Sequence, residues 1–167
     1  KRSEITVSVK HPIVAITGSS GAGTTTVMKS FQHIFRREQI RAQILEGDSM
    51  HRYNRLEMRE AMKQQQAAGN SSFSHFSPEA NLLGDLATTF KTFGESGTGR
   101  VRKYIHDDIE GAEFGQDPGT FTPWKEMEAG AELLFYEGLH GGYVGDDADV
   151  ARHVDLLVGV VPIINLE

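Results

Sequence analysis

Cysteine is absent from the 167-residue sequence, and no hydrophobic run is long enough to cross a bilayer. The lack of cysteine excludes thiol catalysis, cysteine-ligated zinc and dithiol redox switches within these residues. A membrane-spanning helix needs roughly 18 or more apolar residues, and a secretory signal peptide needs an apolar core near its start. Because the sequence has neither feature, we expect a cytoplasmic protein with no membrane partner.

Basic side chains are outnumbered by acidic ones, 17 against 23, so the formal net charge is −6. Binding to nucleic acid relies on a basic face that neutralises phosphates, and this balance argues against a nucleic-acid partner. A small phosphorylated ligand needs only a local basic cluster. The apolar content of 38% and the charged content of 24% are ordinary for a globular domain.

The chain reads as one domain with a short extension. Residues 1–10 alternate polar and apolar side chains without an anchor and are expected to be an N-terminal extension. Residues 11–167 are expected to form the domain. The apolar run 154–161 indicates a buried strand whose continuation is missing, so we expect a domain truncated at its C-terminal side.

Apolar runs alternate with segments of helical periodicity along the domain. Short apolar runs predict strands at 13–16, 41–45, 133–136 and 154–161. Apolar residues at helical spacing predict helices at 27–35, 57–68 and 82–93. Of the remaining segments, 94–99 reads as a helix break, 100–106 as a strand and 107–118 as a surface excursion. This order predicts an α/β fold with a mostly parallel sheet and helices on both faces.

A glycine-rich segment follows the first predicted strand. Its sequence, Gly18-Ser19-Ser20-Gly21-Ala22-Gly23-Thr24-Thr25, fits the pattern G-x-x-x-x-G-K-[ST] except that Thr24 replaces the lysine. Such loops turn backbone N–H groups toward phosphate oxygens, and the following helix N-terminus adds partial positive charge. We therefore predict a nucleotide site over residues 18–25 and Thr26, with the Thr25 hydroxyl offered to Mg²⁺. An ordinary tight turn is the alternative.

Two carboxylates follow predicted strands, Asp48 after 41–45 and Glu137 after 133–136. In parallel sheets ligands bind beyond the carboxyl ends of strands, where Gly18 also falls. Phosphoryl transfer uses one carboxylate to orient or deprotonate the attacking hydroxyl and others to hold the metal. Asp48 and Glu137 are therefore candidate catalytic residues and metal ligands. Helix capping and turn formation are the alternatives.

A local basic cluster follows Asp48. His51, Arg52 and Arg55 provide imidazole and guanidinium groups suited to a substrate phosphate. The alternative is a solvated surface, which applies more strongly to Arg52. A second basic run, residues 100–106, is equally compatible with an exposed sheet edge and with substrate binding. The seven histidines show no close pair at metal-ligand spacing, so a zinc site is not expected.

Five segments together resemble bacterial-type phosphoribulokinase, within the P-loop kinase superfamily. The first is the glycine-rich loop, and that family also carries a residue other than lysine at the Thr24 position. The others are Glu46-Gly47-Asp48-Ser49-Met50-His51-Arg52-Tyr53-Asn54-Arg55, Phe73-Ser74-His75-Phe76-Ser77-Pro78-Glu79-Ala80-Asn81, Tyr104-Ile105-His106-Asp107-Asp108 and Leu134-Phe135-Tyr136-Glu137-Gly138-Leu139-His140-Gly141.

The resemblance implies transfer of the ATP γ-phosphoryl group to the 1-hydroxyl of ribulose 5-phosphate, giving ribulose 1,5-bisphosphate for carbon fixation. Asp48 then matches the catalytic base, and Glu137 matches a second acid near the Mg-nucleotide. The implied substrate-binding residues are His51, Arg55, Tyr104, His106 and His140. The resemblance also implies a homo-oligomer activated by NADH and inhibited by AMP. The family's compensating lysine would lie just beyond Glu167.

Two other readings stay open from the residues alone. The first is another small-molecule kinase of this architecture, acting on a nucleoside or on pantothenate. It shares the glycine-rich loop and the aspartate, but a neutral nucleoside would not need His51 and Arg55. The second is a nucleotide-binding regulatory module without turnover, which the missing lysine favours.

Overall fold

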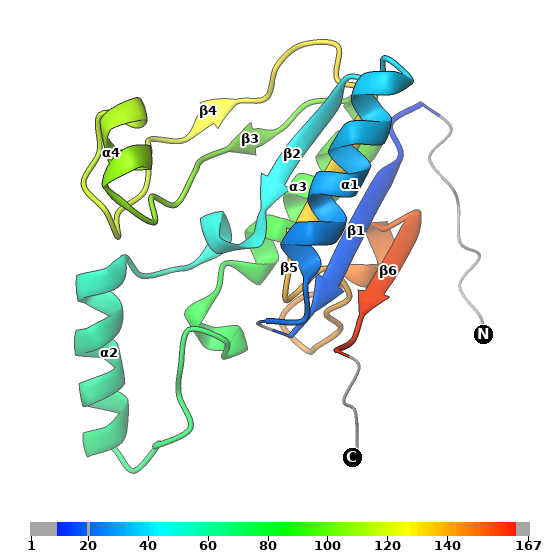
Figure 1. Ribbon diagram of the computed structural model, residues 1–167. Coiled ribbons are helices and arrows are strands. Elements are labelled where there is room, and N and C mark those ends of the chain that lie inside the picture. The colour runs from blue at the N-terminus through cyan, green and yellow to red at the C-terminus, as the bar shows by residue number, and fades with distance from the viewer. Residues whose placement is uncertain (1–9, 20, 163–167) are drawn as a thin grey trace, which may run out of the picture.

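A four-stranded parallel sheet forms the centre of the molecule in the computed structural model, which describes residues 10–19 and 21–162 (Figure 1). The strand order is β2–β5–β1–β6. The strands are β1 (Ile13–Gly18), β2 (Ala42–Glu46), β5 (Leu133–Gly138) and β6 (Leu156–Val160). The predicted α/β fold with a mostly parallel sheet is confirmed. Almost all of the predicted extension, and Ser20 of the glycine-rich loop, lie outside the described residues.

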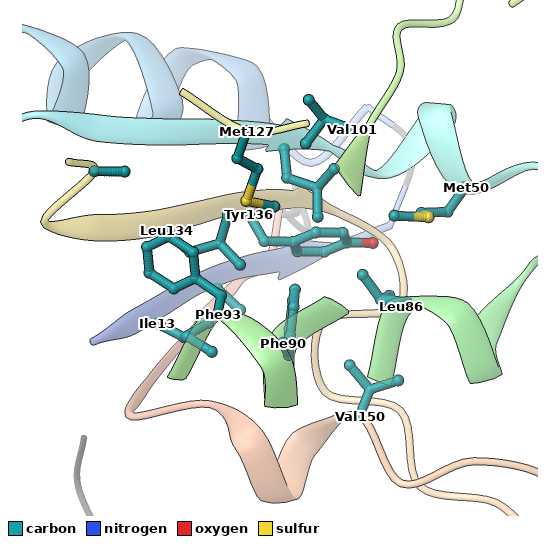
Figure 2. Packing of buried hydrophobic residues seen from close by; sticks show 13 residues of the cluster. Ile13, Met50, Leu86, Phe90, Phe93, Val101, Met127, Leu134, Tyr136 and Val150 are labelled. Atoms are coloured by element: carbon teal, nitrogen blue, oxygen red, sulfur yellow. The ribbon is translucent and has the colours of Figure 1, made fainter. Parts of the chain in front are cut away.

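Helices cover both faces of this sheet because successive strand residues point to opposite sides. On one face, Phe135 packs with Phe31 and Phe35 of α1 (Thr24–Arg37), at ring-centroid distances of 5.1 and 5.2 Å. On the other face, Tyr136 packs edge-on against Phe90 of α3 (Leu83–Ser96), with centroids 5.5 Å apart. Figure 2 shows this second layer, in which Leu134 and Tyr136 meet the side chains of α3.

A second unit lies beside the carboxyl end of β2. The strands β3 (Arg100–Val101) and β4 (Lys125–Glu126) pair antiparallel, and α4 (Asp108–Phe114) lies between them in sequence. The 3-10 helix η1 (Gly47–Met50) follows β2 directly, and α2 (Arg55–Ala67) comes next. No residue of α2 is buried, and the helix extends away from the sheet (Figure 1).

In the segment 100–118, the predicted strand is wrong beyond its first two residues, and the predicted surface excursion is mostly exposed but contains a helix that was not predicted. Only Arg100 and Val101 form a strand, because the chain then turns inward at Arg102. The guanidinium of Arg102 lies 3.7 Å from the centre of the Phe121 ring and donates to the carbonyl of Ser49 at 2.8 Å. The expected surface excursion contains the helix α4, whose N-cap Asp107 accepts hydrogen bonds from two amides of its first turn.

Two further details differ from expectation. Helix α3 continues through Gly94 and ends at Gly97, which adopts the left-handed conformation with φ +70°. Strand β6 is an edge strand rather than a buried one, since within the described residues it pairs only with β1. Its Leu156 and Leu157 are accordingly 51% and 46% exposed. None of the helices described is long and apolar enough to cross a membrane.

Candidate active site

The glycine-rich loop forms a tight turn between β1 and α1. Gly21 and Gly23 have φ angles of +80° and +94°, which L side chains rarely adopt. The amide of Ala22 donates to the carbonyl of Ser19 at 3.0 Å, so the segment is curled rather than extended. Helix α1 starts immediately afterwards, and its first amides face the turn with partial positive charge.

A cavity of about 700 Å³ opens where β1, β2 and β5 end. Five of the predicted nucleotide-binding residues line it: Gly18, Ser19, Gly21, Thr24 and Thr25. Ala22, Gly23 and Thr26 belong to the turn and the first turn of α1 but do not line the cavity. Seven further predicted site residues line the same cavity: Asp48, His51, Arg55, Tyr104, His106, Glu137 and His140. Arg52 does not line it, and its guanidinium donates to the carbonyl of Glu79 at 3.1 Å.

Asp48 lies in η1, directly after β2, which is at one edge of the described sheet. Gly47 allows this placement, because a Cβ there would lie 2.9 Å from the Cα of Gly138 and 2.7 Å from the Tyr136 hydroxyl. The carboxylate of Asp48 contacts two imidazoles. His51 Nε2 is 3.2 Å from Oδ1, and His106 Nε2 is 3.1 Å from Oδ2.

Each of these imidazoles has a second partner. His51 Nδ1 is 2.9 Å from Asn81 Oδ1, and His106 Nδ1 is 3.2 Å from Glu110 Oε2. The Asn81 amide nitrogen donates to two backbone carbonyls, at 3.0 and 2.8 Å, so its oxygen faces the ring. Both imidazoles therefore present donors on both ring nitrogens, which requires them to be protonated.

The titration of the cluster agrees with this geometry. Hydrogen bonds from His106 and then His51 hold the pKa of Asp48 well below its usual range. The hydrogen bond to Asp48 raises the pKa of His106 from 6.5 to about 9. Burial opposes protonation of His51, but the hydrogen bonds to Asp48 and Asn81 outweigh it and the pKa is raised. Two imidazolium groups in one cavity suit an anionic ligand.

Arg55 is the first residue of α2. Asn54 caps the helix in a reciprocal capping box with Glu57, with hydrogen bonds of 2.8 to 3.0 Å. The Arg55 guanidinium donates to the backbone carbonyl of His106 at 2.9 Å. The Tyr104 ring stands edge-on to both imidazoles that contact Asp48, with centroid distances of 6.0 and 5.1 Å.

Glu137 lies near the carboxyl end of β5, next to the glycine-rich loop. Strand β5 pairs it with Ile16 of β1, and Thr25 Oγ1 donates to Glu137 Oε1 at 3.5 Å. A hydroxyl and a carboxylate are oxygen ligands of the kind Mg²⁺ takes beside substrate phosphates and water. These two side chains fit such an ion. Both oxygens of Asp48, in contrast, already face imidazoles.

His140 contributes to the cavity wall on this side. Its Nε2 is 3.2 Å from the backbone carbonyl of Phe76, and burial lowers the pKa of the imidazole. The ring is therefore a neutral donor to that carbonyl and holds the loop around Phe76 against the end of β5.

Several cavity residues were missed from the sequence. Asn81 and Glu110 hold the two imidazoles, and Arg59 adds a second guanidinium from α2 to the cavity wall. Asn81 stands in a segment that carries the family resemblance but had no role assigned. Glu110 lies three residues after Asp107, which is the spacing between the N-cap and the third residue of a capped helix.

The family model described as "Phosphoribulokinase / Uridine kinase family" matches residues 13–167. The chain belongs to this family. It is 56% identical over 158 residues to a phosphoribulokinase of Nitrobacter vulgaris, a match that covers 95% of this chain and 54% of that protein. It is 52% identical over 161 residues to phosphoribulokinase 1 of Cereibacter sphaeroides, covering 96% and 56%. The chain thus spans about half the length of these curated relatives.

Two solved structures are similar to this chain, and the first agrees with its family membership. The phosphoribulokinase from Rhodobacter spheroides superposes with a TM-score of 0.83 at 46% identity, covering 94% of this chain and 53% of that one. A "possible uridine kinase" from Bacillus stearothermophilus superposes with a TM-score of 0.63 at 14% identity, covering 90% and 71%. The second likeness is one of fold alone.

Proposed function

We propose that the protein to which this chain belongs transfers the γ-phosphoryl group of ATP to the 1-hydroxyl of ribulose 5-phosphate. The products are ADP and ribulose 1,5-bisphosphate, the carbon-fixing sugar of the Calvin cycle. The single observation that carries the proposal is the shared cavity, which brings the glycine-rich loop, Asp48 and two imidazoles together.

The donor end of the cavity is the turn between β1 and α1. Backbone amides at the N-terminus of α1 bind the triphosphate oxygens, since the first amides of a helix have no carbonyl partner within the preceding turn of that helix. Thr25 and Glu137 would hold Mg²⁺, which supplies charge neutralisation on the phosphates when bound. The ammonium group of the usual loop lysine is missing at Thr24, and Arg59 is a further cation on the cavity wall.

The acceptor end is the cluster around Asp48. His51, His106 and Arg55 bind the sugar phosphate, and Asp48 accepts the proton of the attacking hydroxyl. A phosphate that takes over the imidazole hydrogen bonds also removes the groups that depress the pKa of Asp48. Substrate binding therefore makes Asp48 a stronger base at the moment when the hydroxyl is in place.

The test is an ADP-release assay with the full-length protein and Mg-ATP. We expect turnover with ribulose 5-phosphate and little with uridine or pantothenate, which lack the phosphate that the imidazoles would bind. Turnover with uridine alone identifies a nucleoside kinase, and ATP binding without turnover on any acceptor identifies a regulatory module. Addition of NADH or AMP to the same assay examines the effector response, and the sedimentation of the protein examines whether it is a homo-oligomer.

Arg55→Ala separates the two ends of the cavity in this assay. The variant is expected to raise the KM for ribulose 5-phosphate by about tenfold, the size of one lost charge-assisted contact, and to leave the KM for ATP unchanged. A rise confined to the KM for ATP would place Arg55 at the donor end and contradict the assignment.

A further inference from the structure

We propose that Glu110 is a positioning residue that holds the His106 imidazole against Asp48, and that Lys103 ties this arrangement to the central sheet. The inference rests on the proposed function, because it assigns Glu110 to the acceptor end of the cavity. Three side-chain contacts and one backbone contact carry it, all within the segment 103–110 and the end of β2.

Glu110 reaches back from the first turn of α4 toward the residue before the helix cap. Its Oε2 accepts a hydrogen bond from the backbone N–H of His106 at 2.9 Å and lies 3.2 Å from Nδ1 of the same residue. An ionised carboxylate can only accept hydrogen bonds, so Nδ1 must carry the proton. The ring is thereby oriented with Nε2 facing Asp48 Oδ2 at 3.1 Å.

The other oxygen of Glu110 is also engaged. Lys103 Nζ lies 3.1 Å from Glu110 Oε1 and 3.1 Å from Glu46 Oε2. The Lys103 side chain is 24% exposed and its two partners are 27% and 31% exposed, so these ion pairs are more protected from solvent than ordinary surface pairs. Glu46 is the last residue of β2 and stands two residues before Asp48.

The contacts close a ring that begins and ends at the carboxyl end of β2. It runs from Glu46 through Lys103, Glu110 and His106 to Asp48. Among the residues that the structure describes, Glu110 is the hydrogen-bond partner of His106 Nδ1. Without the Glu110 carboxylate the half-exposed ring loses the contact that fixes Nδ1, so the sugar phosphate meets a less well oriented donor.

The experiment compares Glu110→Ala, His106→Ala and the double variant in the full-length enzyme. Glu110→Ala is expected to raise the KM for ribulose 5-phosphate about tenfold, with the KM for ATP unchanged. Because Glu110 acts through His106, the double variant should be no worse than His106→Ala alone. Additive effects, or an equal rise in the KM for ATP, would overturn the proposal.

Two matched variants separate positioning from loss of the helix. Glu113→Ala removes an exposed carboxylate from the same helix and is expected to keep the wild-type KM values. Glu110→Gln keeps an acceptor oxygen for His106 and is expected to restore most of the substrate affinity. A Gln variant as weak as the Ala variant, or a Glu113→Ala variant with the same defect, contradicts positioning.

A crystallographic readout needs no turnover and therefore distinguishes this proposal from the proposed function. In crystals of the full-length Glu110→Ala variant, the His106 ring is expected to leave Asp48, while the wild-type protein and Glu113→Ala keep the contact. If the ring stays in place in Glu110→Ala, the proposal fails even where the enzyme turns over ribulose 5-phosphate. If the wild type lacks that activity, the ring position still decides the role of Glu110.

Discussion

Asp48 lies between two imidazoles, and the other ring nitrogen of each imidazole contacts a further side chain. Asn81 holds His51 and Glu110 holds His106, so the two protonated rings face the carboxylate in a set geometry. In the proposed reaction, Asp48 is a weak base until the substrate phosphate displaces the two rings. Under that proposal, this one residue couples binding of the phosphate to the strength of the base.

The same cluster predicts how stability depends on pH. The pKa of His106 is raised to about 9 in the folded protein, from 6.5, so its contribution to stability is complete below pH 6.5 and is lost as the pH rises to about 9. The lowered pKa of Asp48 makes a contribution that is present above its usual value of 3.8 and is lost in acid. The free energy of unfolding lost in His106→Asn should therefore be larger at about pH 5.5 than at about pH 9.5.

Urea denaturation of the wild-type protein and the variant at both pH values measures this difference. His33→Asn, at an exposed position of α1, controls for the removal of a surface histidine. A loss in His106→Asn that grows with pH would contradict the protonated ring.

At the scale of elements, the turn between β1 and α1 is defined by backbone conformation rather than by side chains. Gly23 has φ +94° and no heavy atom within 4 Å of an added Cβ. Gly69, which follows α2 and does not line the cavity, has φ +90° and the same open surroundings. Both positions therefore require a left-handed backbone conformation, but only Gly23 lies in the turn between β1 and α1.

We predict that Gly23→Ala and Gly69→Ala each lose about 1–2 kcal/mol of stability, the cost of a left-handed L-residue. Only Gly23→Ala should weaken ATP binding, because only that turn aims amides at the phosphates. Calorimetric ATP titration and thermal unfolding of the full-length variants measure both quantities. Equal loss of ATP affinity in the two variants would show that the turn has no special role.

At the scale of the whole molecule, the central sheet could be predicted and the second unit could not. The runs at 13–16 and 133–136 are apolar on both faces, which is typical of strands covered by two helix layers. The segment 100–106 alternates like a strand for a different reason. Arg102 turns inward to stack on Phe121 and to bind the backbone of η1, a tertiary contact that no local pattern encodes.

Some residues of the candidate site could likewise be predicted from the sequence, and others could not. The residues 18–25, Asp48 and Glu137 could be found because each directly follows a predicted strand. The contact between Asp48 and His106 joins positions 58 residues apart and was not predicted, because the family resemblance implied only that both residues belong to the site. Glu110 and Asn81 act behind the imidazoles, and their roles depend on folded geometry that spacing alone does not give.

In the proposed reaction, one cavity brings together a phosphate-binding turn and Asp48 as general base. The most direct measurement is the steady-state rate of ADP release by full-length Asp48→Asn with Mg-ATP and ribulose 5-phosphate. Asparagine keeps the size of the side chain and removes its ability to accept the proton, so kcat should fall about 100-fold or more while ATP affinity is kept. An unchanged kcat would show that Asp48 is not the base.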